Sequence, residues 1–410
     1  MKPRVAANTA VLAALKVGAP LCSLLLVLAV TRKLGAEGLG RYSLAYAYLA
    51  LFSLLGPLGL PALITREGAR DAGALERLLA NGVTLGGGVS VALVLAMAGS
   101  SQLFGYDAAT ARALAVLSLA LPPSTCLTYF DAAFLALEST WPMAVATLGE
   151  HVIKVGLGLL LLFEGSGLEA VLGAAVAGRL AACAISIALL RRLGVRLPLR
   201  IEMAALRFLM VEAPVFALSA ICATLYWRID VFLLARFRGL REVGYYTAAY
   251  RILDLAILLP QSLCHSLYPG LAAERCGERS PQAAALGWLS LLTAPAALVV
   301  TILAGPLLGR LYGPGFVTAA PMLAILIWTA LPYAWNRYQA YVLVAADRQR
   351  ADLAINAGLL AVNVASNLVL IPRYGGLGAA AVTLGTALLY GAVQFSLLRL
   401  RPTATAMESA

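Results

Sequence analysis

The chain has 410 residues, of which 61% are hydrophobic and only 12% charged, and its formal net charge is +11. Soluble domains usually carry about 25% charged residues, so this composition excludes an ordinary soluble enzyme. The basic residues are mostly arginines scattered between long apolar runs, which is typical of membrane-protein loops and argues against nucleic-acid binding.

Apolar runs long enough to cross a bilayer follow one another along the chain. A helix needs about 20 apolar residues to span a hydrocarbon core roughly 30 Å thick. The first half contains such runs at 8–31, 41–65, 78–100, 108–136, 141–163 and 167–190. The second half contains them at 206–235, 243–270, 283–309, 316–345, 351–371 and 376–398. We therefore predict an all-α integral membrane protein of about twelve spans, the first of them retained rather than cleaved as a signal peptide.

A segment at the start of the second predicted span recurs in the other half of the chain. The two copies read Gly40-Arg-Tyr42-Ser-Leu-Ala45-Tyr46 and Gly244-Tyr-Tyr246-Thr-Ala-Ala249-Tyr250. Duplicated hydrophobic halves are typical of transporters. We expect two six-helix bundles related by internal duplication, residues 1–190 and 206–410, joined by a basic cytoplasmic linker at 191–205.

Lys and Arg are distributed unequally over the predicted loops. With the N-terminus inside the cell, the inner loops and the linker carry the larger share, although Arg236, Arg238 and Arg241 fall on the outer side. The positive-inside rule therefore predicts that both termini lie in the cytoplasm.

Charged side chains within predicted spans are candidates for a substrate site, because a charge in hydrocarbon is costly. Lys154 lies near the middle of the fifth span and Lys16 in the inner half of the first, and cations at this depth suit a phosphate group. Further candidates in or near the spans are Arg179, Arg228, Arg251, Asp131, Asp230 and Asp254.

Several of these residues also have a purely structural interpretation. Lys16 could extend to the inner interface, Lys154 could pair with Glu150 one turn earlier, and Arg251 could neutralise Asp254 on the same helix face. Arg228 and Asp230, near the outer end of their span, could be interfacial.

One comparison favours a function for Arg251 and Asp254. At the offset of the repeat they align with Ala47 and Ala50, so the charges are additions to the duplicated scaffold.

Other chemistry is scarce in the sequence. The cysteines are widely spaced, no C-x-x-C pair occurs, and His151 and His265 have no surrounding ligand constellation. No Walker loop is present. We expect no metal, no cofactor and no catalytic residue. The aromatic residues between Trp328 and Tyr341 could line a carbohydrate path.

A set of glycine, tyrosine and charged positions occurs in order along the chain. These positions are Leu34-Gly35-x-x-Gly38-x-Gly40-x-Tyr42-Ser43, Gly59, Arg66-Glu67-x-Ala69-Arg70, Arg228-x-Asp230, Val243-Gly244-x-Tyr246-x-x-Ala249-x-Arg251, Tyr268-Pro269 and Leu311-Tyr312-Gly313-x-x-Phe316. The set resembles the polysaccharide transporters of the multidrug/oligosaccharidyl-lipid/polysaccharide exporter superfamily. The resemblance is to the O-antigen and exopolysaccharide branch. It is weaker to the peptidoglycan-precursor branch, which usually has two further spans.

The resemblance implies a V-shaped, MATE-like exporter fold and a flippase for undecaprenyl-pyrophosphate-linked oligosaccharide in the bacterial inner membrane. It adds Arg66 to the substrate-binding candidates and supports Arg228, Asp230 and Arg251. Asp131, Asp230 and Asp254 are candidates for coupling to H⁺ or Na⁺, or for gating. The implied partners are membrane lipids, a polysaccharide polymerase and glycosyltransferases. The implied role is export of lipopolysaccharide or another surface polysaccharide.

Two other functions stay open at this level. A drug or organic-cation antiporter of the same superfamily should favour acidic and aromatic residues in its cavity. An integral-membrane polymerase or glycosyltransferase would normally carry a long outer loop, and none is predicted. A purely scaffolding membrane protein would leave the duplication unexplained.

Overall fold

The computed structural model describes residues 3–195, 228–273, 279–345 and 349–399. The chain divides into two compact units, Met1–Leu225 and Tyr226–Ala410. We describe each unit by itself. Most of the predicted linker at 191–205 and of the predicted seventh span at 206–235 lies outside the described residues.

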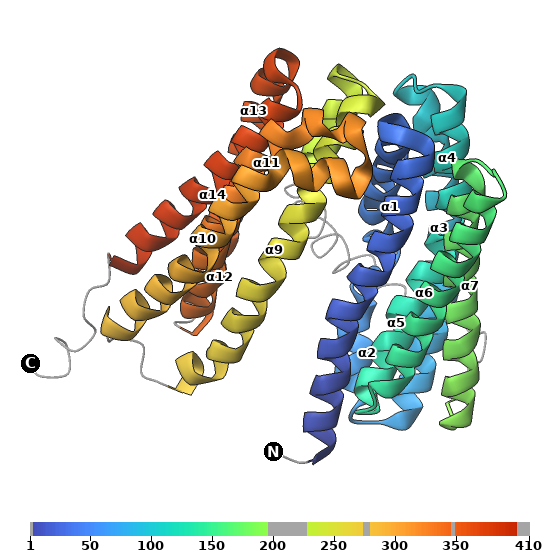
Figure 1. Ribbon diagram of the computed structural model, residues 1–410. Helices are drawn as coiled ribbons and strands as arrows, with labels where there is room; N and C mark the ends of the chain where they lie inside the picture. The colour runs from blue at the N-terminus through green and yellow to red at the C-terminus, as the bar shows by residue number, and fades with distance from the viewer. Residues whose placement is uncertain (1–2, 196–227, 274–278, 346–348, 400–410) are drawn as a thin grey trace, which may run out of the picture. The chain divides into compact units, whose positions relative to one another are not determined.

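Unit 1 is built entirely from helices over its described part (Figure 1). They are α1 (Pro3–Ser53), α2 (Leu60–Gly68), α3 (Ala72–Leu103), α4 (Ala108–Ser118), α5 (Leu121–Ala136), α6 (Trp141–Phe163) and α7 (Leu168–Arg192). Within α1 the backbone is non-helical at Gly35, with φ 67° and ψ −165°. This left-handed conformation suits glycine and separates two helical stretches.

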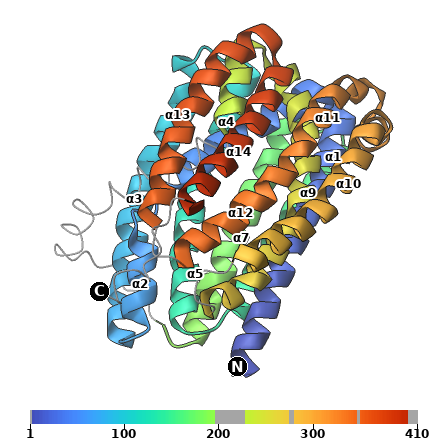
Figure 2. The ribbon, with the colours of Figure 1, turned by 90° about the vertical axis from the view of Figure 1, so that its left-hand side faces the viewer.

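Unit 2 begins its described part with helical residues 228–237. It continues with α9 (Leu240–Ala273), α10 (Arg279–Tyr312), η1 (Pro314–Ala319), α11 (Ala320–Leu326), η2 (Ile327–Thr329), α12 (Ala330–Ala345), α13 (Gln349–Tyr374) and α14 (Gly376–Arg399). Helix α14 packs against both α13 and α12, and α12 also packs against α9 (Figure 2).

The all-helical prediction is confirmed over the described chain. Eight helical segments there are long and apolar enough to cross a membrane. They are Gly73–Leu103, Ala108–Ala136, Trp141–Phe163, Leu168–Arg192, Leu286–Tyr312, Pro314–Ala340, Ile355–Tyr374 and Gly376–Leu397. Each overlaps one of the spans predicted from hydropathy.

The predicted span at 41–65, whose Pro57 indicates a kinked helix, is interrupted in the structure. The helix stops at Ser53 and a new one, α2, starts at Leu60. Between them Pro57 lacks a backbone N–H, and Leu58 and Gly59 adopt positive φ values of 52° and 73°. Irregular backbone at this depth is tolerated in a membrane protein where it is buried in protein or lines a cavity.

The duplicated tyrosines are part of the core of each unit. The rings of Tyr42 and Tyr46 lie 4.6 Å apart in unit 1, and those of Tyr246 and Tyr250 lie 5.7 Å apart in unit 2. Tyr42 is 3% exposed and Tyr246 1%. The repeated segment therefore serves as scaffold in both units.

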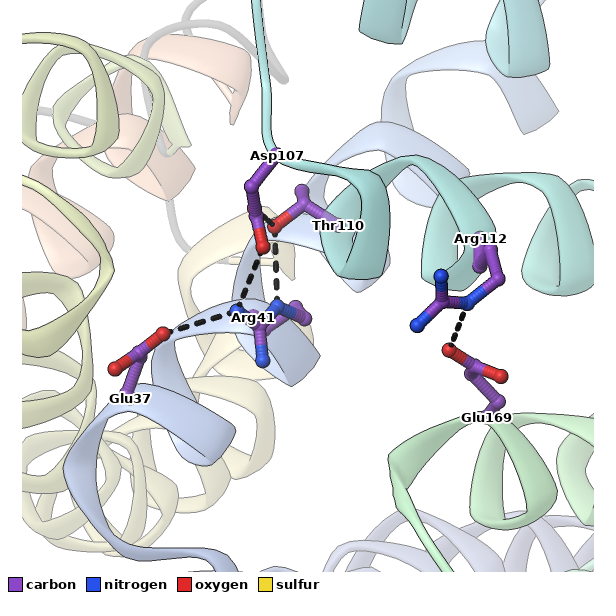
Figure 3. Close-up of polar contacts among 6 residues, drawn as sticks. All are labelled: Glu37, Arg41, Asp107, Thr110, Arg112 and Glu169. Atoms are coloured by element: carbon purple, nitrogen blue, oxygen red, sulfur yellow. Dashed lines mark hydrogen bonds and ion pairs between the residues drawn. The ribbon is translucent and has the colours of Figure 1, made fainter.

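A polar cluster joins α1, α4 and α7 at one end of unit 1 (Figure 3). Arg41 donates to Thr110 at 3.0 Å and pairs with Asp107 at 3.1 Å, and Arg112 pairs with Glu169 at 2.6 Å. Burial alone would raise the pKa of the Asp107 carboxyl. The hydrogen bond from Thr110 and the charge of Arg41 more than offset this, so the pKa of Asp107 lies below its ordinary value.

Candidate functional site

The predicted cations Lys154 and Arg179 lie on facing helices of unit 1. Arg179 on α7 pairs with the Glu150 carboxylate on α6 at 3.2 Å. Lys154, one turn after Glu150, donates to the Ser23 hydroxyl of α1 at 3.0 Å and is 7% exposed. The Glu150 side chain is 8% exposed and the Arg179 side chain 37%. Arg179 is therefore the more accessible of the two cations.

Glycine at position 178 permits the close packing of α6 and α7 at this pair. A Cβ atom there would lie 2.8 Å from the Glu150 carbonyl oxygen and 3.2 Å from Lys154 Cβ. Both neighbours belong to the backbone or to its first side-chain atom and cannot swing away. Gly178 thus sets the distance across which Arg179 reaches Glu150.

Gly178→Ala is expected to destabilise the protein by about 1–3 kcal/mol, because α6 and α7 must separate to make room. A melting curve of the purified protein in detergent should show a lower melting temperature. Gly173→Ala, on the same helix and with nothing within 4 Å of its added Cβ, is the matched control. Equal melting temperatures for both variants would contradict the packing role of Gly178.

Unit 1 also contains a cavity of about 640 Å³ at the helix break. Pro57, Leu58 and Gly59 line it from the break, and Arg179 is the single charged residue among its described lining residues. Hydroxyl groups line it as well, from Tyr46, Ser53, Ser124 and Thr128. Drug-sized ligands typically occupy about 300–1,000 Å³. The cavity is thus large enough for a ligand, and its one charged residue among the described lining residues is a cation.

Acidic residues surround Arg179 from two helices. Glu150 forms the ion pair from α6, and Asp131 on α5 interacts electrostatically with both Arg179 and Glu150. The guanidinium is attracted to both carboxylates, which repel each other. An anionic ligand entering the cavity would compete with these two groups for Arg179.

Unit 2 holds a separate group of charges. Asp230 is 7% exposed and accepts hydrogen bonds from the Tyr246 hydroxyl and from the Val231 N–H. Arg251 and Asp254 approach to 3.7 Å on one face of α9, and each side chain is about one third exposed. The pairing proposed from their spacing is therefore present.

A small cavity of about 10 Å³ lies among the charges of unit 2, with room for about one water molecule. Arg228, Asp230, Arg251 and Asp254 all line it. Arg228 interacts electrostatically with both acids. The four predicted residues of this unit thus form one cluster.

Two of the predicted substrate-binding residues belong to neither cluster as the structure describes them. Arg66 is in the last turn of α2, where its side chain is 68% exposed and pairs with the adjacent Glu67 at 2.8 Å. Lys16 belongs to α1, but its side chain lies outside the described residues. Among the described residues no three metal-ligating side chains lie together in a group.

Sequence reasoning missed the cavity at the helix break and the role of Glu150 as the partner of Arg179. The signal for the break was present, because Gly56, Pro57, Gly59 and Pro61 interrupt an otherwise helical span. The signal for the ion pair was absent. Glu150 and Arg179 lie on different helices, and no local pattern joins them.

The family model described as polysaccharide biosynthesis protein matches residues 5–273. The chain belongs to this polysaccharide biosynthesis family. The match confirms the resemblance to polysaccharide transporters drawn from the sequence motifs.

A curated relative of this polysaccharide biosynthesis protein is described as "Probable flippase AglR" of Haloferax volcanii. The two chains are 28% identical over 167 residues, which are 39% of this chain and 35% of the relative. The aligned segment thus spans about a third of that relative's length.

Solved structures show the same fold. One is an inward-facing multidrug resistance MATE family transporter of the MOP superfamily, with a TM-score of 0.73, 15% identity, and coverage of 97% of this chain and 100% of that chain. Another is the lipid II flippase MurJ in an inward closed conformation, with a TM-score of 0.79, 12% identity, and coverage of 95% and 87%. This member of the polysaccharide biosynthesis family therefore has the fold of MOP-superfamily transporters.

Proposed function

We propose that this protein is a flippase that moves an undecaprenyl-pyrophosphate-linked oligosaccharide across the bacterial inner membrane for surface polysaccharide synthesis. The observation that carries the proposal is the cavity of unit 1, in which Arg179 is the charged lining residue. A pyrophosphate presents oxygens that a planar guanidinium binds in two places at once. Family membership and the likeness to MurJ support the same function.

The pyrophosphate replaces Glu150 as the partner of Arg179 in this proposal. Arg179 and Glu150 already form a short contact of 3.2 Å, so the ligand exchanges one anion for another rather than desolvating a free cation. Lys154, one turn after Glu150 on α6, adds positive potential, which raises the affinity for a doubly charged group. Substrate release restores the Arg179–Glu150 pair.

Arg251, Arg228, Arg66 and Lys16 are the further substrate-contact candidates. Asp131, Asp230 and Asp254 are the groups through which H⁺ or Na⁺ would couple to transport, or which would form gating pairs with arginine. Asp254 and Arg251, 3.7 Å apart, form such a pair. Alternating access, with both termini in the cytoplasm, completes the proposed mechanism. No covalent step is involved in transport itself. Glycosyltransferases act before transport and a polymerase acts after it.

A drug or organic-cation antiporter is the second candidate considered. Its substrate would have to enter a cavity in which the charged lining residue is an arginine. Repulsion between like charges in a partly dry site makes this unfavourable. The cavity therefore favours the anionic lipid.

Lys154→Ala and Arg251→Ala are each expected to abolish surface polysaccharide in cells that depend on the altered protein. Lys154→Ala removes a buried charge that supports the anion site, and Arg251→Ala leaves Asp254 without its partner. The measurements are the amount of surface polysaccharide and the amount of lipid-linked saccharide in the cells, which should fall and rise respectively. Immunoblots of the membrane fraction control for protein level. Normal surface polysaccharide in both variants would contradict the cationic-site proposal.

A further inference from the structure

Unit 2 contains a larger cavity besides the small one among its charges. This larger cavity has a volume of about 200 Å³ and lies among α9, α12, α13 and α14 and the helical residues 228–237. Most of its lining residues have polar side chains, which is unusual for a membrane-spanning bundle. Hydroxyl, amide and charged side chains line it, including Tyr333, Arg337, Asn356, Tyr390 and Asp230. Polar groups inside a bilayer are costly and indicate a functional surface by default.

The polar side chains of this cavity hold one another in place. Asn356 on α13 donates to the Tyr390 hydroxyl on α14 at 3.1 Å. Arg337 on α12 donates to the Tyr333 hydroxyl at 3.1 Å, and its guanidinium lies 5.4 Å from the centre of the same ring. These contacts fix the side chains before any ligand arrives, which lowers the entropy lost on binding.

Further amides of the lining are hydrogen-bonded across the same helices. Asn363 on α13 donates to the Thr386 hydroxyl on α14 at 3.3 Å, and Asn367 donates to Asn363 Oδ1 at 2.9 Å. Asn336 donates to the Ala387 carbonyl oxygen at 2.8 Å. Such a network keeps the polar faces of α12 and α13 turned toward α14.

The chemistry of the lining selects a neutral polyhydroxyl ligand. Arg337 and Asp230 contribute opposite charges that offset each other, so the charged lining residues favour neither an anion nor a cation. Amides and tyrosine hydroxyls both donate and accept, as sugar hydroxyls do. Tyr250, Tyr333 and Tyr390 supply aromatic rings. The volume is below the roughly 300–1,000 Å³ of sites for drug-sized ligands, which suits one sugar ring.

We propose that this cavity is a subsite for one sugar ring of the lipid-linked oligosaccharide. The proposal rests on the proposed flippase function and adds to it a site for the saccharide, separate from the anion site at Arg179. The anion site then recognises what all such lipids share, and the subsite in unit 2 distinguishes lipids that carry a sugar from those that do not.

Binding measurements with two lipids test this subsite. The first probe is the lipid-linked saccharide fraction extracted from cells in which the gene is deleted, and the second is sugar-free undecaprenyl pyrophosphate. Each is titrated into the full-length protein in detergent and followed by native mass spectrometry. The test variant is Tyr333→Phe/Tyr390→Phe, which removes two lining hydroxyls and keeps both rings. Tyr390→Phe alone is the milder variant.

The double variant is expected to bind the saccharide-bearing lipid about tenfold to thirtyfold more weakly, since two hydrogen bonds of about 1 kcal/mol each are lost. Tyr390→Phe alone should weaken it about threefold to fivefold. Binding of undecaprenyl pyrophosphate should stay unchanged in both, which also shows that the variants are folded. Tyr338→Phe, on the same helix but packed in the core with Cys264, Leu289 and Val342, is the matched control and should bind both lipids normally.

Three results would overturn the subsite. Unchanged binding of both lipids by the double variant would show that the two tyrosine hydroxyls do not contact the sugar. The proposed flippase function would still stand. A sodium-dependent melting temperature that the double variant loses, without any effect on saccharide binding, would assign the cavity to a cation. Failure of the unaltered protein to bind either lipid would overturn the flippase function and the subsite with it.

Discussion

Arg179→Gln is expected to weaken binding of undecaprenyl pyrophosphate by about tenfold to a hundredfold and to stop polysaccharide export. Hydrogen bonds to charged groups contribute about 1.5–3 kcal/mol each, and glutamine supplies neither the charge nor the planar fork. Arg179 is the one charged residue among the described lining residues of the cavity in unit 1, so no other residue of that lining supplies a positive charge in its place. Lipid titration of the purified protein and the amount of surface polysaccharide measure the two effects.

A loss of stability must be separated from the loss of binding. Arg179→Gln also leaves the Glu150 carboxylate, with its side chain 8% exposed, without its 3.2 Å partner. Breaking a buried pair by removing one member is more destabilising than removing both. The double variant Arg179→Gln/Glu150→Gln should therefore regain melting temperature but still fail to bind the pyrophosphate lipid.

Two further variants sharpen the test of this site. Arg179→Lys keeps the charge without the two-point geometry and should bind with intermediate affinity. Glu150→Gln keeps Arg179 and removes its competing anion, so binding should be at least as tight as in the unaltered protein. Recovery of lipid binding in Arg179→Gln/Glu150→Gln would show that the arginine acts only on stability.

Gly56→Ala is expected to lower stability by about 1–3 kcal/mol and to disturb the helix break that lines the cavity. The added Cβ would overlap Thr125 Oγ1 and would lie 3.1 Å from Ser90 Oγ. Those two hydroxyls are hydrogen-bonded to each other at 2.7 Å, and both residues are buried, so neither can move freely. A melting curve in detergent should show the loss as a lower melting temperature.

A second-site change tests whether this clash is the cause. Thr125→Ala removes the oxygen nearest the new Cβ, so Gly56→Ala/Thr125→Ala should regain most of the stability lost by Gly56→Ala. Thr125→Ala alone should cost about 1 kcal/mol for its hydrogen bond with Ser90. Gly87→Ala, with nothing within 4 Å of its Cβ, is the matched control. A double variant less stable than either single variant would exclude the clash as the cause.

The sequence by itself determined the fold class of this protein, most of its spans and its family. Hydropathy over about 20 residues is a local property, and a bilayer makes it decisive because every spanning backbone must form its hydrogen bonds internally. The sequence also indicated that the repeated segment around Tyr42 and Tyr246 is scaffold. Residues that pack in the core of both halves are expected to occur in both copies of a duplicated segment.

Only the tertiary structure decided which charges meet and where the cavities lie. Arg179 reaches Glu150 because Gly178 lets α6 and α7 approach closely, a distance that no spacing along the chain encodes. Arg251 and Asp254, three residues apart on one helix, could be paired from the sequence because helix geometry places them on one face. The larger cavity of unit 2 is lined by Tyr333, Asn356 and Tyr390, which come from three different helices. Contacts within a helix follow from its period, whereas contacts between helices depend on packing that all the residues determine together.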